Sequence, residues 1–273
     1  MNAQTLSRIE LESAGFSLKG TGVHYGRARL PGRRSYLFSH MGAEKGAEYD
    51  RLYQTDPWHI YAWQQEQATL LRILATYYRN QHIKLLDFAC GTARITSFLE
   101  DKVDEAVGVD VSESMLAVAE RKVKRAKLLH ANLLKDNLLA GEKFNLITAF
   151  RFFPNAEPAL RNAALEVLTS LLSENGCLVL NNHINRQSMF HLYYRLKNSI
   201  ARRTHRPTFS MGDCREMLFR WKLKITRVYS VGLLHIPHYQ LPQALLRADD
   251  LGSCSSWLAA CSESPTIVCR HRR

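Results

Sequence analysis

Residues 84–110 (KLLDFACGTARITSFLEDKVDEAVGVD) constrain the fold of this chain more than any other stretch. One apolar run, residues 83–89, ends in the small-residue turn CGTA at 90–93, and a second, residues 106–109, ends at Asp110. Both runs have the length of buried strands, and the spacing of roughly twenty residues leaves room for one crossover helix. The pattern predicts two neighbouring parallel strands, with a ligand at their carboxyl ends.

The turn between these strands indicates which kind of ligand. A dinucleotide fold needs G-x-G-x-x-G to bring a pyrophosphate against backbone, and here only Gly91 is a glycine, with Ala89 and Ala93 at the flanking small positions. Asp87 lies in the strand end before the turn, where an acid and backbone carbonyls can hold an ammonium group. Asp110 can accept hydrogen bonds from both hydroxyls of a ribose. This arrangement favours a cofactor that carries an amino acid.

Residues 87–93 (DFACGTA) resemble the first motif, D-x-G-x-G-x-G, of the class I S-adenosylmethionine-dependent methyltransferases. Alanine stands at two of the three glycine positions, so we expect negative φ angles there. The resemblance covers roughly residues 47–230 and is closest to the branch that acts on small molecules and glycans. It implies a Rossmann-like, doubly wound, mostly parallel seven-stranded sheet, with S-adenosyl-L-methionine as the cofactor. Strand patterns at 126–132, 144–150, 177–180 and 223–231 fit this sheet, and the last strand, 266–270, is expected to be antiparallel.

The resemblance also implies positions that contact the cofactor. In this family a helix with the pattern Y-D-x-x-Y, here residues 49–53, lies across the methionine end, where aromatic faces attract a sulfonium. Packing of both tyrosines into the core is the equally open alternative. Asn132, after the third strand, is expected to read the adenine amino group. The full predicted cofactor set is Tyr49, Tyr53, Asp87, Ala89, Cys90, Gly91, Asp110, Val111, Met115, Asn132, Leu133, Ala149 and Phe150.

Two residues near the ends of the fourth and fifth strands are the predicted catalytic ones. Arg151 follows the fourth strand and can bind an anionic acceptor. His183, in the polar segment NNHIN at 181–185, can act as general base for an acceptor hydroxyl, or can instead hydrogen-bond a loop. The segment AFRF at 149–152 lacks the N-P-P-Y-like tetrad of enzymes that methylate exocyclic base nitrogens, which argues against that chemistry.

Composition sets the outer limits. The formal net charge of +12 points to an anionic partner, either nucleic acid, a membrane surface or an acidic acceptor. The six cysteines show no C-x-x-C spacing, no apolar run nears eighteen residues, and no signal-peptide pattern opens the chain, so a cytoplasmic protein without a membrane span is predicted. His235 and His238 have no third ligand nearby, and no metal site is predicted.

The chain is predicted to divide into a basic, Gly-rich N-terminal extension, residues 1–46, and a methyltransferase domain, residues 47–273. Residues 232–264 form an insertion of the length of a lid or binding element. The extension is either a solvated tail or an arm that closes on the acceptor.

The predicted activity is transfer of a methyl group to an oxygen of a small-molecule or glycan acceptor. Two alternatives stay open. One is an RNA methyltransferase, based on the net charge and the basic segments 27–34 and 201–206; the other is a non-catalytic S-adenosylmethionine-binding module. The sequence does not decide the acceptor or the oligomeric state.

Overall fold

Seven strands form one sheet in the order β3-β2-β1-β4-β5-β7-β6 in this computed structural model. The structure describes residues 36, 45–183, 185–200, 209–234 and 248–272, all within a unit that begins at residue 35. The predicted extension 1–46 and the middle of the predicted insertion therefore lie largely outside the described residues. The strands are β1 Lys84–Phe88, β2 Glu105–Asp110, β3 Lys127–His130, β4 Phe144–Ala149, β5 Leu172–Asn181, β6 Leu223–Tyr229 and β7 Thr266–His271.

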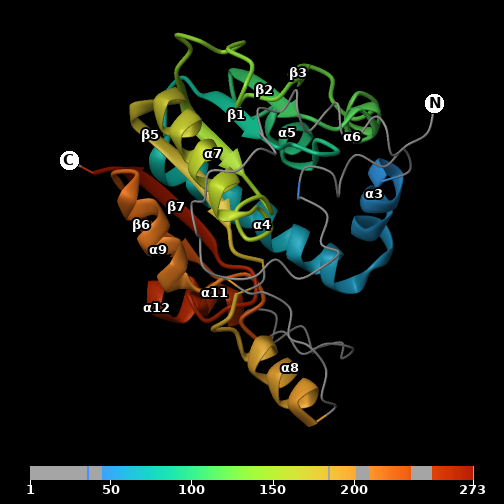
Figure 1. The fold of residues 1–273 in the computed structure, drawn as a ribbon, viewed down its shortest axis with the longest axis vertical. Helices are drawn as coiled ribbons and strands as arrows, with labels where there is room; N and C mark the ends of the chain where they lie inside the picture. The colour runs from blue at the N-terminus through green and yellow to red at the C-terminus, as the bar shows by residue number, and fades with distance from the viewer. Residues whose placement is uncertain (1–35, 37–44, 184, 201–208, 235–247, 273) are drawn as a thin grey trace, which may run out of the picture. The chain divides into compact units, whose positions relative to one another are not determined.

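Helices cover both faces of the sheet (Figure 1). Their bounds are α3 Lys45–Thr55, α4 Pro57–Tyr77, α5 Arg94–Leu99, α6 Glu113–Ala119, α7 Pro158–Leu171, α8 Met189–Ile200, α9 Met211–Arg220, α11 Ala248–Gly252 and α12 Ser256–Ala259. Several helices begin where the sequence provides a cap: Ser112 accepts from the amide of Met115 at the start of α6, and Asp56 precedes Pro57 at the start of α4. None of these described helices is both long and apolar enough to cross a membrane.

The sheet buries alternate residues against two different helix layers, as the pleat of a strand requires. Leu86 of β1 and Leu178 of β5 belong to the core cluster that includes α7 and α9. Their sequence neighbours Leu85 and Val179 point to the other face and pack in the cluster with α4 and α5. Central strands buried on both sides account for the continuous apolar runs in the sequence.

The predicted seven-stranded sheet is confirmed. β1 pairs in parallel with β2 and β4, and β7 lies between β5 and β6, antiparallel to both. The resulting order is that of the class I methyltransferase sheet expected from the resemblance. Because β1 and β4 are neighbours whose connections leave in opposite directions, the crevice at their carboxyl ends is where a ligand belongs.

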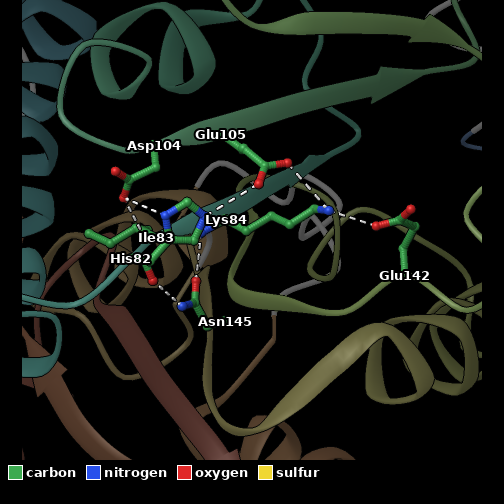
Figure 2. A network of polar contacts seen from close by, with 7 residues as sticks. All are labelled: His82, Ile83, Lys84, Asp104, Glu105, Glu142 and Asn145. Carbon is green, nitrogen blue, oxygen red and sulfur yellow. Dashed lines mark hydrogen bonds and ion pairs between the residues drawn. The ribbon is translucent and has the colours of Figure 1, made fainter.

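The opposite end of β1, away from that crevice, is fixed by a polar network (Figure 2). The side-chain amide of Asn145 accepts from the backbone amide of Lys84 at 2.8 Å and donates to the carbonyl of His82 at 2.5 Å. The Lys84 ammonium pairs with Glu142 at 2.6 Å, and its contact with that carboxylate raises the pKa of Lys84. These contacts fix the start of β1 beside β4. The amino end of β1 therefore helps to set the register of these two strands and to stabilise the sheet.

Candidate active site

A cavity of about 1200 Å³, its open mouth included, lies at the carboxyl ends of the central strands. Most residues of the predicted site line it: Tyr49, Asp87, Ala89, Cys90, Gly91, Asp110, Val111, Met115, Asn132, Leu133, Phe150, Arg151 and His183. Tyr53 and Ala149 were predicted as cofactor contacts but are not among the lining residues. Ala149 is the last residue of β4 and is fully buried in the core, because its methyl group points into the sheet's packed face.

The turn after β1 has a conformation that the sequence did not suggest. Ala89 and Ala93 adopt φ angles of 55° and 54°, in the left-handed region, where negative values were expected; that expectation was wrong. Gly91 has a φ of 55° as well. The turn is closed by hydrogen bonds, including one of 3.0 Å from the amide of Ala93 to the carbonyl of Cys90. These contacts outweigh a strain of about 1–2 kcal/mol per alanine.

Asp110 is held at the end of β2 by two backbone amides. Gly91 N donates to Oδ2 and Ser112 N donates to Oδ1, both at 2.8 Å. These two amides fix the orientation of the carboxylate at the end of β2. A side chain built on Gly91 would meet no atom nearer than the sulfur of Met115 at 4.0 Å, so it would project into the cavity.

Asp87 is the most buried acid of the cavity, with 2% of its surface exposed. Thr96 donates to its Oδ2 from both N and Oγ1, at 3.2 and 2.7 Å, and Thr148 Oγ1 donates to its Oδ1 at 2.7 Å. Burial nevertheless raises the pKa of Asp87 to about 6, because desolvation outweighs these hydrogen bonds. The three donors fill three of about four acceptor positions of a carboxylate, which leaves Asp87 able to bind one more.

Arg94 lines the cavity and is largely buried. Its guanidinium lies 4.2 Å from the ring centres of both Tyr53 and Trp63 and donates to Glu66 at 2.6 Å. Tyr53 does not line the cavity but packs against Arg94, and its hydroxyl lies 3.3 Å from that of Tyr49. The spacing of four residues in a helix placed both tyrosines on one face, but only the nearer one reaches the cavity.

Arg151, after the end of β4, and His183, after the end of β5, both line the cavity. Arg151 N donates to Asn181 Oδ1 at 2.6 Å, while its side-chain Nε is buried without a hydrogen-bond partner among the described residues. His183 Nδ1 is also buried and has no hydrogen-bond partner among the described residues. Burial, with the nearby charge of Arg151, holds the pKa of His183 well below its usual range. Asn155 Nδ2 donates to the carbonyl of Arg151 at 2.7 Å and lies 3.3 Å from His183 Nε2.

An aromatic wall beside these two residues was not predicted. Tyr36 and Phe152 both line the cavity, and their ring centres are 5.5 Å apart. Phe88 stacks edge-on against Phe152 at 5.0 Å. The aromatic run FRFF at 150–153 was a signal that could have identified Phe152. No local pattern marks Tyr36, which lies in the predicted extension and reaches the wall only through tertiary folding.

No cluster of three or more metal-ligating side chains occurs within the described ranges. His235 and His238 fall outside them, so the absence of a metal site there stays a prediction. Cys90 faces the cavity, but burial raises the pKa of its thiol well above the usual range, and it is held as a neutral thiol.

Comparisons with known proteins agree with this geometry. Residues 85–176 match the family model described as a methyltransferase domain. The demethylmenaquinone methyltransferase of Staphylococcus saprophyticus is 31% identical over 139 residues, which are 48% of this chain and 56% of that protein. The chain thus spans somewhat more than half the length of the curated relatives it matches.

Solved structures show the same fold at low sequence identity. The magnesium protoporphyrin IX methyltransferase of Synechocystis PCC 6803, solved with bound SAH, has a TM-score of 0.56 and 15% identity, with all of both chains covered. A TehB-like SAM-dependent methyltransferase of Corynebacterium glutamicum has a TM-score of 0.53 and 18% identity, over 84% of this chain and 98% of that one.

Proposed function

We propose that this chain is a class I S-adenosylmethionine-dependent methyltransferase that methylates an oxygen of a small anionic acceptor. Its sheet order and the match of residues 85–176 to the methyltransferase domain model support the family. The cofactor supplies a methyl group on a sulfonium, which is already activated toward a nucleophile. The residues of the chain then have to bind the acceptor, orient it toward the methyl group and exclude water from the site.

The cavity residues suit this cofactor from one end to the other. Asp110, oriented by two amides, would accept the ribose hydroxyls, and Asp87 would accept from the ammonium group with its remaining acceptor position. Tyr49 also lines the cavity. The open space next to Gly91 supports close approach of a ligand to the backbone, because a side chain at that position would fill it.

The observation that carries the acceptor proposal is the pair of unpartnered buried nitrogens, Arg151 Nε and His183 Nδ1, on one cavity. A buried donor without a partner costs about 1–3 kcal/mol, so such atoms are rare unless a ligand satisfies them. Two such atoms on one cavity suit a ligand that brings its own acceptor oxygens.

The hydrogen bonds of Asn155 support a donor role for His183. The Asn155 nitrogen that approaches His183 Nε2 also donates to the carbonyl of Arg151, so it is the amide NH₂ and Nε2 accepts from it. A neutral imidazole then carries its proton on Nδ1, and the lowered pKa of His183 keeps the ring neutral. We therefore infer that His183 donates to the acceptor. The general-base role predicted from the sequence would need the other tautomer.

An acceptor held by two donors can present an ionised oxygen, such as a carboxylate, that needs no base for methylation. The aromatic wall of Tyr36, Phe88 and Phe152 supports an acceptor with an apolar or planar body beside that anionic group.

The test is transfer of radiolabelled methyl into fractionated small-molecule extract, followed by steady-state kinetics on the acceptor recovered. Arg151→Met should raise KM for the acceptor more than Kd for the cofactor, and the exposed Arg121→Met serves as the matched control. His183→Asn places an amide donor near Nδ1 and should keep kcat within about tenfold, whereas His183→Ala should lose about 10- to 100-fold, the usual effect of removing a hydrogen bond to a charged group. Equal losses in Asn and Ala variants would favour the general base.

RNA as the acceptor is the alternative that the same labelling experiment addresses. Its two basic segments, 27–34 and 201–206, lie outside the described residues. Label in RNA, with binding that weakens steeply as salt rises, would replace the small-molecule proposal.

A further inference from the structure

Helix α8 exposes an apolar stripe to solvent. Met189, Leu192 and Leu196 are 62%, 57% and 61% exposed. Their spacing of three and four residues places them on one side of the helix, and Tyr193, 48% exposed, lies along the same side. Figure 1 shows α8 standing out from the layers that cover the sheet. An exposed apolar stripe of this kind marks a surface that binds another protein or a membrane.

The stretch of sequence that contains this helix has no acidic residue. Residues 175–212 contain no aspartate or glutamate. The basic residues in this acid-free segment are Arg186, Arg195, Lys197, Arg202, Arg203 and Arg206. Arg186 is paired with Asp213 at 3.4 Å. Arg195 is exposed on α8 itself, next to the stripe. An apolar helix face surrounded by arginine and lysine is typical of helices that lie in a membrane interface.

We propose that α8 docks on the surface of an anionic lipid bilayer. The stripe of Met189, Leu192 and Leu196 would enter the boundary between headgroups and acyl chains, while the exposed Arg195 stays near the phosphates. A helix of twelve residues is too short to cross the hydrocarbon core, so the helix lies in the plane of the surface.

The charge pattern favours a bilayer over a second copy of this chain. Two α8 helices packed through their stripes would bring two acid-free segments together, and their like charges would repel each other. An anionic surface satisfies the same charges without that repulsion.

The amino end of α8 is fixed to the body of the protein, so docking would orient the whole molecule. Ser188 Oγ donates to Glu263 at 2.6 Å and accepts from the amide of His191 at 3.0 Å, and both Ser188 and Glu263 are buried. His183, which lines the cavity, precedes this anchor by five residues. The docking itself does not depend on the proposed methyl transfer, because it uses none of the cavity residues.

Vesicle flotation of the full chain tests the proposal. We expect binding to vesicles of phosphatidylcholine mixed with phosphatidylglycerol, little binding to phosphatidylcholine alone, and weakening as salt rises. The double variant Leu192→Glu/Leu196→Glu should lower the affinity at least about tenfold. The control is Leu138→Glu/Leu251→Glu, which makes the same charge change at leucines 61% and 72% exposed elsewhere. It should bind like the unmodified chain.

Three results would overturn the assignment. They are equal binding to both kinds of vesicle, equal losses in the two double variants, and retention of binding by Leu192→Glu/Leu196→Glu with an unchanged circular dichroism melt. A dimer that the α8 variant dissociates, in a protein that binds no vesicles, would assign the stripe to self-association instead.

Discussion

Cofactor binding should weaken in acid because of a single buried carboxyl group. Asp87 is neutral below its pKa of about 6, and a neutral acid no longer attracts the ammonium group of the cofactor. The perturbation is a pH series from 5 to 8, with Asp87→Asn as the variant that cannot titrate. Asparagine preserves the local packing, since its oxygen can accept from Thr96 and its amide can donate to the hydroxyl of Thr148.

The size of the effect follows from the pKa. At pH 5 about one Asp87 in eleven is ionised, so the Kd should be about tenfold higher than at pH 8, or about 1.4 kcal/mol. Folding should show the opposite dependence. The pKa of Asp87 is raised in the folded state, so its contribution to the free energy of unfolding is greatest below about pH 4 and is lost as pH rises through about 6, a change of at most about 3 kcal/mol.

Isothermal titration with S-adenosylhomocysteine measures the prediction without turnover. Adenosine is the matched control ligand, because it keeps the ribose and base but lacks the amino acid. Its Kd should change little between pH 5 and 8. Asp87→Asn should bind S-adenosylhomocysteine more weakly at pH 8 and should lose the pH dependence.

A flat Kd for S-adenosylhomocysteine across this range would refute the reasoning. The same slope for adenosine would also contradict it, because the titrating group would then act on the nucleoside or on folding.

Three further predictions follow from other parts of the structure. Asp110→Ala should weaken binding of S-adenosylhomocysteine and of adenosine alike by about 1.5–3 kcal/mol, measured by titration, and unchanged affinities would remove the ribose assignment. Burial raises the pKa of Glu263 from 4.5 to about 8, so the stability it contributes is present in full below about pH 4.5 and is lost as pH rises to about 8. Urea midpoints should fall between pH 5 and 8 in the unmodified chain and fall less in Glu263→Gln. Ala89→Gly should raise the melting temperature slightly, because relief of about 1–2 kcal/mol of left-handed strain exceeds the roughly 0.4–1 kcal/mol of added unfolded-state entropy. Ala62→Gly, within α4, should instead lose about 1 kcal/mol, and equal losses at both alanines would argue against strain at Ala89.

Much of the scaffold was determined by local sequence. The apolar runs of β1 and β2, the crossover length between them and the cap at Ser112 are local signals, because strand length, helix spacing and capping depend on near neighbours. Asp110 was predicted at the strand end for the same reason, and the structure places it there with two amide donors.

Tertiary structure alone decided the features on which the proposed chemistry depends. Ala89 and Ala93 lie in a turn that packs against the end of β2. This packing holds their φ angles in the left-handed region, against the local preference of alanine. Tyr36 reaches the cavity from 115 residues before Arg151, with its hydroxyl 3.4 Å from that residue's carbonyl. The unpartnered nitrogens of Arg151 and His183 depend on what surrounds them in space, and a sequence shows which donors exist but not which of them a fold leaves unsatisfied.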